Sequence, residues 1–407
     1  MLDIGQIHRA EYELDTSRSL RGKNPRKTAN KRPDEKPPVV IAEAPGRIHI
    51  LGDQGDPVSD SYLSAAIDRY IHVAVSPRKD NSFRFYAADL GERKRSTLVN
   101  LKYRREDRWA NYLKTAIYLF SGMGCSMKGM NFSFCGNIPQ QIGLASSTAI
   151  ESAAAVALKN LLRIQISDME LAQKLHEAHQ EFFSSAAPAV DYYVCLLARK
   201  DHFLFVDISG GVFEKIKSPF SLFRFLVIDS RVPRLGAENE MASRKADVLK
   251  GLELLSQKFD GASFKDFAAA DILEALGNLP EQVRRRSMHI VEEIHRVNDA
   301  VEALQRSDLA SLSKIIFHSH ESLRDLFEIS CPELDWLVKR AQELEGAAGA
   351  RMTGHGFGGC TYTIIRKELV EEYKRRLEEY ERIFGFRPVI YEVKIAKGAR
   401  VIPNKGG

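Results

Sequence analysis

The chain has 407 residues, of which 44% are hydrophobic and 28% charged, and its formal net charge is only +5. This balance is that of an ordinary folded protein, so it excludes a largely disordered chain, and the length favours two domains over one. No run approaches the roughly 20 apolar residues of a membrane span, and the first residues lack the basic-then-apolar order of a signal peptide. We therefore expect a cytoplasmic protein without a membrane partner.

The first 38 residues are predicted to be a disordered, basic leader. They are rich in lysine and arginine between residues 18 and 36, prolines interrupt the same stretch, and only Asp34 and Glu35 oppose the positive charge there. Such a composition cannot bury a core. A basic segment is able to bind nucleic acid, but without interleaved aromatic residues a solvated leader is the preferred interpretation, and we expect no nucleic-acid partner.

Residues 39–215 are predicted to form an N-terminal domain. Aromatic and β-branched residues indicate its strands, and apolar residues at helical spacing indicate its helices. The turn-rich Ser209-Gly210-Gly211 lies near its predicted end. The expected strands are 39–42, 47–51, 65–75, 82–87, 130–134 and 202–208, and the expected helices are 109–120, 147–162, 168–183 and 191–198.

Residues 216–407 are predicted to form a C-terminal domain. It begins with an apolar strand at 223–229, and long amphipathic helices follow through 334–344. A strand at 361–365, a helix at 367–383 and a strand at 389–395 complete it. Strands and helices in this mixed order predict an α+β fold, not a doubly wound parallel sheet.

A loop of small and hydroxyl residues runs straight into the predicted helix after residue 147. Glycine lets a backbone approach a ligand closely, and a helix N-terminus offers unpaired N–H groups to an anion. The loop is therefore a candidate phosphate cradle, and a helix capped by its own serines is the alternative. The candidate residues are Pro139, Gly143, Leu144, Ala145, Ser146, Ser147, Thr148 and Ala149.

A second glycine-rich loop contains Gly354, Gly356 and Gly358. It matches G-x-G-x-x-G formally, but a dinucleotide-binding loop follows a strand and opens a helix, whereas this one opens onto an alternating strand. Two interpretations stay open. The loop presses its backbone against a ligand or against the first loop, or it is a tight packing turn.

Two charged residues are candidates for the chemistry. Arg47 follows Ala44-Pro45-Gly46, and an arginine is always charged and suits a phosphate or a carboxylate. Asp191 lies in an otherwise apolar stretch shortly after Pro188. It either caps a helix or belongs to a site, and its sequence context alone favours the cap.

Taken together, these elements resemble the GHMP small-molecule kinases, and within them the galactokinase branch. The resemblance covers nearly everything from Val39 to Val401. It rests on P-x-x-x-G-L-x-S-S-x-A at 139–149, a counterpart of A-P-G-R-V-N-L-I-G-E at 44–53, R-W-A-N-Y at 108–112, the stretch 190–207, and a nearly intact C-terminal signature at 330–335 and 351–360.

The resemblance implies a two-domain GHMP kinase fold with the active site in the cleft between the domains. ATP would lie there, with its triphosphate on the loop 143–149 and on Gly354, Gly356 and Gly358. Trp109 would pack beside the adenine, with core packing as an equal alternative. Arg47 and Asp191 would act on the acceptor hydroxyl, and Ser147 would be a ligand of Mg²⁺.

The chain departs from the galactokinase pattern where that pattern contacts the sugar. Galactokinases have G-E-H-T-D-Y, whereas here Asp53 and Gln54 replace the Glu-His pair and only Asp56 is unchanged. Pro188 replaces a glycine and so removes an N–H donor, and Met241 replaces a sugar-contacting tyrosine. Because buried polar partners discriminate strongly between substrates, we expect altered galactose recognition.

A further departure concerns the metal. The acidic residue that galactokinases place about a dozen positions before the catalytic aspartate corresponds here to His179. Mg²⁺ prefers oxygen ligands and keeps several waters, so either Glu181 or water would have to substitute. On a helix Glu181 would point roughly 200° around the axis from His179.

The sequence therefore predicts an ATP- and Mg²⁺-dependent sugar kinase that phosphorylates the anomeric (C1) hydroxyl of galactose or a related sugar, and acts as a monomer. The alternative is a non-catalytic protein derived from a galactokinase, which binds sugar and ATP and regulates a partner. A GHMP kinase for a non-sugar alcohol fits less well, because the C-terminal half follows the galactokinases closely.

Overall fold

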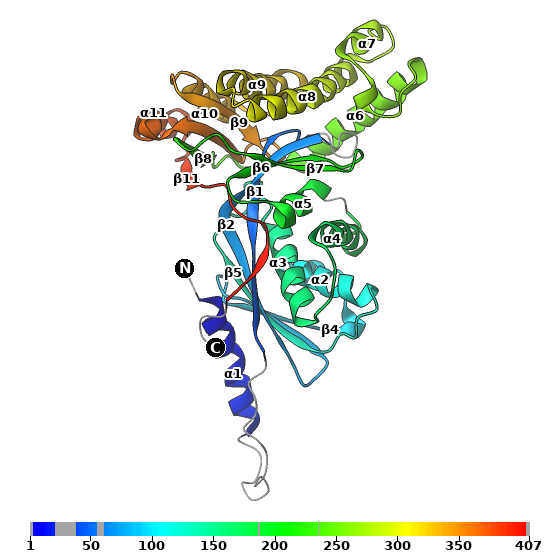
Figure 1. Ribbon diagram of the computed structural model, residues 1–407, viewed down its shortest axis with the longest axis vertical. Coiled ribbons are helices and arrows are strands. Elements are labelled where there is room, and N and C mark those ends of the chain that lie inside the picture. The colour runs from blue at the N-terminus through cyan, green and yellow to red at the C-terminus, as the bar shows by residue number, and fades with distance from the viewer. Residues whose placement is uncertain (1–2, 21–37, 55–60, 186–187, 235, 404–407) are drawn as a thin grey trace, which may run out of the picture.

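The computed structural model describes residues 3–20, 38–54, 61–185, 188–234 and 236–403, with the backbone alone for 13–20 and 238 (Figure 1). The chain forms two domains, each built on its own β-sheet, and the sheet of the N-terminal domain runs lengthwise through the lower part of Figure 1. Helices cover these sheets, so the fold is α+β.

The N-terminal sheet has the strand order β12-β1-β2-β5-β3-β4, and the hairpin β6-β7 pairs with the first residues of β2. All its pairs are antiparallel except β3 with β5. Its strands are β1 (Val40–Leu51), β2 (Ser61–Pro77), β3 (Ser82–Ala87), β4 (Glu92–Thr97), β5 (Met130–Gly136), β6 (His202–Asp207), β7 (Val212–Lys217) and β12 (Arg400–Ile402).

β1 is one continuous strand, although the sequence predicts two. It pairs with β2 along its length, and the register shifts between Pro45 and Gly46. Pro45 interrupts the apolar pattern and has no N–H to donate, so the local sequence suggests a break where the ladder only shifts. Beyond the shift, side chains alternate between the faces of the strand, which places Arg47 and His49 on the same face.

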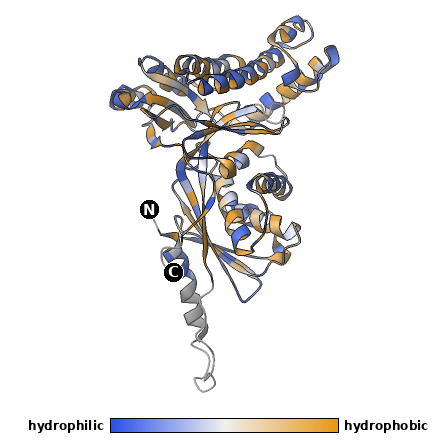
Figure 2. Cartoon of the chain, in the orientation of Figure 1, coloured by the Kyte–Doolittle hydropathy of each residue, from blue (hydrophilic) through white to orange (hydrophobic). Residues whose placement is uncertain are grey.

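Helices α2 (Ala110–Gly122), α3 (Ser146–Leu161), α4 (Asp168–Phe183) and α5 (Ala189–Leu197) lie on one side of this sheet (Figure 1). The central helix, α3, buries a run of alanines, and such small side chains allow close approach to β1 and β2. Ser167 caps α4 by accepting a hydrogen bond from the N–H of Glu170 at 3.1 Å. Figure 2 shows hydrophobic residues along these strands and on the helices that cover them.

The C-terminal domain has a second, antiparallel sheet with the order β11-β8-β10-β9. Its strands are β8 (Phe223–Asp229), β9 (Ala347–Thr353), β10 (Cys360–Arg366) and β11 (Val389–Val393). Its helices are α6 (Ala237–Lys258), α7 (Ala269–Glu274), α8 (Glu281–Gln305), α9 (Leu309–Ser322), α10 (Pro332–Gln342), α11 (Val370–Leu377) and α12 (Glu379–Phe384). The single helix predicted at 367–383 is therefore interrupted, at Glu378.

The chain crosses between the domains at two places. β7 ends at Lys217 in the first sheet and β8 begins at Phe223 in the second, so the predicted division at 215/216 falls inside β7. The last strand, β12, returns to pair with β1, with Ile402 opposite Ile41. The N-terminal sheet thus includes the strand β12 from the far side of the C-terminal domain, so a single boundary in the sequence does not separate the two domains.

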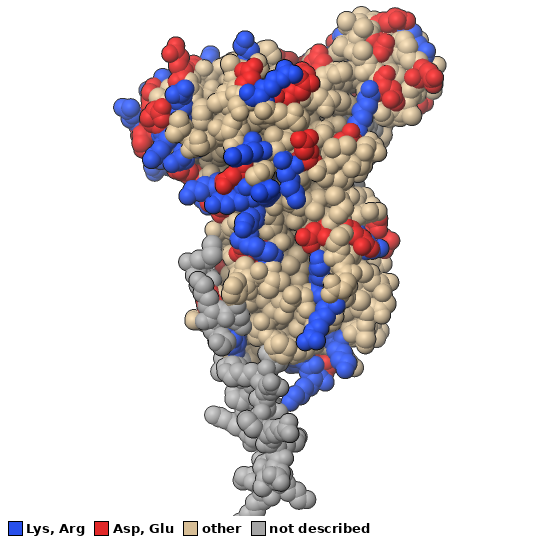
Figure 3. Space-filling view, in the orientation of Figure 1, with Lys and Arg blue, Asp and Glu red and all other residues tan. Residues whose placement is uncertain are grey.

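Charged side chains of both signs are interspersed over the C-terminal domain on the face drawn in Figure 3. Many form exposed pairs, such as Lys250 with Glu253 at 3.0 Å, which contribute at most about 1 kcal/mol each. Within the described ranges, no helix is long and apolar enough to cross a membrane.

Helix α1 (Ile4–Leu20) departs from the predicted disordered leader. Ile4 packs against Ile41 and Ala74, on the opposite side of the sheet from α2–α5 (Figure 1). The ring of His8 lies between the hydroxyls of Ser133, at 2.9 Å, and Ser76, at 2.8 Å. Positions 4 and 8 share one face of a helix. The prediction of disorder rested on the basic stretch that follows them, and it overlooked this spacing. Residues 21–37, which hold most of that stretch, lie outside the described residues.

The packing of α1 is predicted to depend on pH. Burial, with a smaller effect of the Arg9 charge, lowers the pKa of His8 from 6.5 to about 3. The neutral ring therefore stabilises the packed helix fully above pH 6.5. Below it this stabilisation falls by about 1.4 kcal/mol per pH unit until the folded-state pKa is reached.

Hydrogen exchange of residues 4–12 between about pH 7 and about pH 4, corrected for intrinsic rates, measures this loss. In His8→Asn the amide is polar but does not titrate in this range, so protection should become independent of pH. His202→Asn is the matched control, since His202 lies on β6 away from α1. Equal pH dependence in wild type and His8→Asn would contradict the prediction.

Candidate active site

A buried ion pair joins β1 to α5. Arg47 donates from Nε to Asp191 Oδ1 at 2.6 Å and from Nη2 to Oδ2 at 2.8 Å. The side chains of Arg47 and Asp191 are 4% and 6% exposed. Burial raises the pKa of Asp191, but the Arg47 charge and the hydrogen bonds to His49 and Arg47 outweigh it and hold the pKa well below its usual range. Asp191 is therefore ionised at neutral pH.

His49 completes the surroundings of Asp191. Its Nε2 lies 3.1 Å from Asp191 Oδ1, and its Nδ1 lies 2.7 Å from the hydroxyl of Ser64 on β2. Burial and the Arg47 charge lower the pKa of His49. A neutral ring next to an ionised carboxylate donates from Nε2, so Ser64 donates its hydroxyl to Nδ1. Asp191 is thus held from two sides in one orientation.

Asp191 is not a helix cap, although its local sequence favours that role. Pro188 is the N-cap of α5, and among the described residues no side chain caps this helix end. The Asp191 carboxylate instead reaches across to β1, 144 residues away in sequence. This long-range partner could not be inferred from the residues around Asp191.

The loop before α3 is tied to β1 by Arg47. The Arg47 N–H donates to Leu144 O at 3.2 Å, and Arg47 Nη1 donates to Gly143 O. Gly46 allows this approach, because a Cβ there would lie 3.0 Å from Leu144 O. The carbonyl oxygens of Gly143 and Leu144 are therefore hydrogen-bonded to Arg47 on β1.

The N-terminus of α3 is left open by the same loop. Ala145 is the N-cap with a left-handed φ of 59°, and none of the described side chains caps the helix. Ser146 and Ser147 lie inside the helix, which excludes the serine-capped alternative. The first N–H groups of α3 therefore remain available to an anion.

The second glycine loop meets the first through its backbone. Gly143 and Gly354 both have positive φ, at 91° and 85°, and a Cβ on Gly354 would lie 3.4 Å from the Cα of Gly143. Gly356 and Gly358 contact other segments instead. A Cβ on them would lie 2.5 Å from Ile329 O and 3.0 Å from Val232 O. Of the three glycines, Gly354 thus faces the candidate phosphate loop, and the other two serve tight packing.

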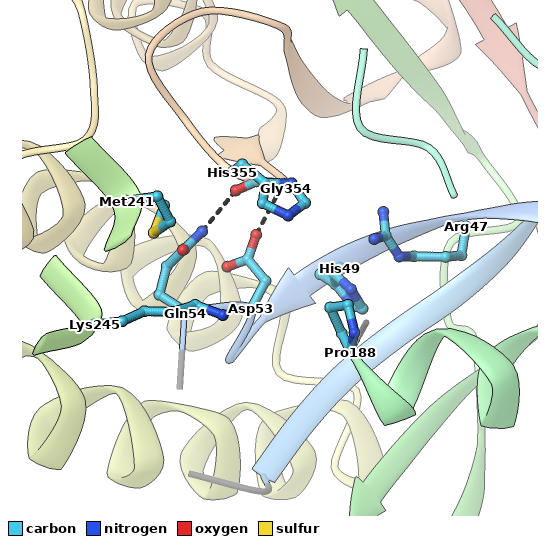
Figure 4. Close-up of a pocket in the computed structure, with 9 residues that line it drawn as sticks. All are labelled: Arg47, His49, Asp53, Gln54, Pro188, Met241, Lys245, Gly354 and His355. Atoms are coloured by element: carbon cyan, nitrogen blue, oxygen red, sulfur yellow. Dashed lines mark hydrogen bonds between the residues drawn. The ribbon is translucent and has the colours of Figure 1, made fainter. Parts of the chain in front are cut away.

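A pocket opens between the domains beside this contact (Figure 4). Its empty space, including the part that is open to solvent, is about 380 Å³. Its lining brings together most of the residues predicted to bind the sugar. The lining residues are Arg47, His49, Asp53, Gln54, Pro188, Met241, Lys245, Gly354 and His355.

Asp53 and Gln54 point toward the Gly354 turn (Figure 4). Gln54 donates from Nε2 to Gly354 O at 2.6 Å, which leaves its Oε1 as an acceptor. Asp53 Oδ2 accepts the Gly354 N–H at 2.9 Å, and its Oδ1 accepts from Arg351 at 2.6 Å. Both oxygens of Asp53 are therefore engaged within the protein. Asp56, the remaining predicted sugar ligand, lies outside the described residues.

Arg351 anchors Asp53 to the C-terminal domain through a buried network. Its side chain is 0% exposed and also contacts Glu293 at 3.2 Å and Ser319 Oγ at 2.8 Å. Glu293 in turn accepts the N–H of Gly52 at 3.0 Å. Burial raises the pKa of Glu293, but Arg296 and Arg351 outweigh it and hold the pKa below its usual range. We call Asp53, Arg351 and Glu293 the clasp.

Sequence reasoning missed His49, Lys245 and His355 as lining residues. His49 lies two positions after Arg47, and the period of two along a strand was the available signal. His355 lies inside the second glycine loop, and burial lowers its pKa. Lys245 is one turn along α6 from Met241, so helical spacing would have paired them.

Trp109 is a core residue in this structure. It is 8% exposed, packs at 5.3 Å between ring centroids from Phe134, and donates from Nε1 to Glu92 at 2.8 Å. These contacts satisfy the indole within the protein. The core alternative explains its position, and an adenine contact remains a prediction.

The residues around Ser147 do not form a magnesium site of their own. His179 faces α3, where its Nδ1 lies 2.8 Å from Glu151. Glu181 is therefore on the far side of α4, where it is exposed and accepts from Tyr118 at 3.1 Å, so the structure does not place it beside Ser147. Within the described ranges, no group of three or more His, Cys, Asp or Glu residues could hold a metal ion. Ser147 alone remains as a predicted protein ligand.

The clasp is predicted to stabilise the junction between the domains. Arg351→Met leaves the buried carboxylate of Asp53 without its cation and leaves Glu293 with Arg296 alone, which should lower the free energy of unfolding by about 3–5 kcal/mol. Because the pKa of Glu293 is held below its ordinary 4.5, the contribution is present above pH 4.5 and is lost as the pH falls below it.

Urea unfolding at neutral and acid pH measures both effects. Arg375→Met, on the exposed side of α11, is the control and should change little. A loss in Arg351→Met no larger than in the control would show that the clasp is not stabilising.

The chain matches known protein families and individual proteins over most of its length. Family models match the GHMP kinases N terminal domain over residues 111–199, the GHMP kinases C terminal over 300–382 and the galactokinase galactose-binding signature over 30–77. A Treponema pallidum (strain Nichols) protein with the provisional name galactokinase is 38% identical over 90% of this chain and 93% of its own length. The galactokinase of Roseiflexus sp. (strain RS-1) is 30% identical over 90% of this chain and 94% of its own.

Solved structures agree on the fold. The Lactococcus lactis galactokinase complexed with galactose superposes with a TM-score of 0.85 at 24% identity, over 89% of this chain and 95% of that one. The Methanococcus jannaschii mevalonate kinase has a TM-score of 0.62 at 18% identity, over 90% and 100% of the two chains. The predicted two-domain fold and family are confirmed: this chain belongs to the galactokinase family of the GHMP kinases.

Proposed function

We propose that this protein transfers the γ-phosphoryl group of ATP to the C1 hydroxyl of galactose or a closely related sugar. The observation that carries the proposal is the buried Arg47–Asp191 pair. Arg47 of this pair lines the pocket between the domains, and it is hydrogen-bonded to the loop that leaves the N-terminus of α3 open. The relatives named galactokinase in this family support the same reaction.

The residues divide the work of phosphoryl transfer, which needs mainly positioning and charge stabilisation. When bound, ATP supplies the phosphoryl group, and the Gly143 loop with the first turn of α3 would hold its phosphates. Arg47 would offset negative charge that develops on the transferred group. Asp191 would orient the acceptor hydroxyl and take its proton.

The low pKa of Asp191 limits how strong a base it is. Two cationic or polar partners, Arg47 and His49, stabilise its ionised form. In a loose transition state the acceptor hydroxyl needs little activation before the phosphoryl group arrives. Orientation of the hydroxyl and late acceptance of the proton are therefore the roles that suit Asp191.

The identity of the sugar depends on groups that the family pattern does not share. Both carboxylate oxygens of Asp53 are engaged, and Oε1 of Gln54 accepts no hydrogen bond from the residues that the structure describes. Met241 supplies an apolar surface where galactokinases have a tyrosine hydroxyl. We therefore propose an altered sugar preference, in which galactose binds more weakly than a relative that requires fewer acceptors from the protein.

The non-catalytic alternative gains no support from the site. A regulatory sugar sensor has no need of the charge-paired Arg47 and Asp191, and here both are present and buried. The two proposals differ in one measurable outcome, which is whether ADP is released in the presence of a sugar.

The test is an ADP-release assay with ATP over a panel of aldoses, uronic acids and amino sugars. A product with phosphorus coupled to the anomeric proton in its NMR spectrum would support transfer to C1. Folded protein that binds ATP but turns over no member of the panel would contradict the enzyme and favour the sensor.

The role of Asp191 has its own prediction. Asp191→Asn cannot take the proton, so kcat should fall by about 10²–10⁴-fold, whereas binding of ATP should stay near the wild-type value. Asp201→Asn, in an exposed turn before β6, is the matched control and should keep wild-type kcat. An unchanged kcat in Asp191→Asn would remove this residue from the mechanism.

A further inference from the structure

Arg234 lies between the two glycine loops. It follows β8 in the chain, and its Nη2 is 3.3 Å from Gly358 O and 3.5 Å from Ile142 O. A Cβ on Gly359 would lie only 1.6 Å from that nitrogen, and one on Gly143 would lie 3.5 Å from it. The guanidinium can therefore occupy this place only because residue 359 is a glycine.

Arg234 has no carboxylate within ion-pair distance among the residues that the structure describes. Arg47 and Arg351 each contact a carboxylate at 2.6 Å. Among the residues that the structure describes, Arg234 forms no ion pair, and its Nε is buried without a hydrogen-bond partner. Burial lowers its pKa, and the neighbouring acidic groups offset this only in part. A half-buried guanidinium in this state lacks an anion.

Two neutral carbonyl groups do not supply that anion. Distances of 3.3 and 3.5 Å are at or beyond the long end for an N–H···O hydrogen bond. A guanidinium has five N–H donors in a planar fork that matches phosphate oxygens. Among the described residues Nε has no acceptor and Nη2 has only these two long contacts, so a purely structural tie between the loops leaves much of the hydrogen-bonding capacity of the guanidinium unused.

Its position indicates which anion would bind. Gly143 has Arg47 on its carbonyl side and Arg234 next to its Cα, and the open N-terminus of α3 begins only a few residues later. An extended chain of phosphates that lies along the loop toward α3 would pass within reach of Arg234. A single phosphate bound at the first turn of α3 would instead contact the helix N–H groups alone.

We infer that Arg234 binds the polyphosphate of a nucleoside di- or triphosphate and holds it against both glycine loops. This inference rests on the proposed function, because it assigns a residue to the phosphoryl donor of that reaction. Arg47 is neutralised by Asp191, so among the described residues around the two glycine loops Arg234 is the one that offers a positive charge without a paired carboxylate.

Calorimetry without sugar tests the inference with ATP, ADP, AMP and inorganic tripolyphosphate. In Arg234→Gln the affinity for ATP and tripolyphosphate should fall about 10–100-fold, as for loss of a hydrogen-bonded charge, and that for AMP should change little. Arg234→Lys keeps the charge but not the fork and should recover part of the loss. Arg231→Gln, an exposed residue of the same segment paired with Asp229 at 3.3 Å, is the control.

Three outcomes would overturn the inference. They are wild-type affinity for ATP in Arg234→Gln, an equal loss for AMP and ATP together with a lower Tm, or a wild-type protein that binds no polyphosphate. Gly359→Ala gives a second route, since its Cβ displaces the guanidinium, and the same ranking of nucleotides is expected. Wild-type protein that binds ATP but phosphorylates no sugar would refute the proposed function and leave this inference standing.

Discussion

The two domains meet where backbone contacts backbone, at Gly143 and Gly354. Each residue has a left-handed φ, which favours glycine, and a Cβ on Gly354 would lie in van der Waals contact with Gly143. This approach brings the loop before α3 within reach of residues that come from the other sheet. The pocket, the clasp and the position of Arg234 all depend on it, because each of them uses groups from both sides of the junction.

Electrostatic pairing divides the arginines of the junction into two kinds. Arg47 and Arg351 are buried with carboxylates, and a buried charge is tolerated only with such a partner. Arg234 is buried in part and has no carboxylate among the described residues. The first two shape the site before any ligand arrives, whereas the third carries a charge that a ligand can satisfy. This division separates the residues that build the site from those that bind in it.

One part of the pocket keeps the positions of the galactokinase pattern, but the residues at these positions make different contacts. Asp53 occupies the place of a sugar-gripping glutamate in the galactokinase pattern, but its shorter side chain is held by Arg351 and by the N–H of Gly354. The carboxylate has become part of the junction between the domains. Gln54, His355 and Met241 line the same pocket, and under the proposed function they would contribute more of the recognition of the acceptor.

The sequence by itself determined the family, the α+β class and most of the elements, because motifs and hydrophobic periodicity are local properties. Strand 223–229 and helix 168–183 have their predicted bounds. It also indicated Arg47, Asp191 and the loop before α3 as candidates for one site. Predictions from local sequence patterns were wrong where contacts with distant segments determine the structure. Ile4 and His8 anchor a helix in a segment whose basic composition predicts disorder. The strand β12 pairs with β1, which begins some 360 residues earlier in the chain.

Only the tertiary structure decided what each side chain contacts. It turned Asp191 from a plausible cap into the partner of Arg47, and it paired Glu181 with Tyr118. It engaged both oxygens of Asp53, and within the described part of the chain it gave Arg234 no carboxylate at ion-pair distance. The physical reason is that burial and charge pairing depend on segments far apart in the chain, and a residue's own neighbours in sequence do not record which distant group will lie within 3 Å of it.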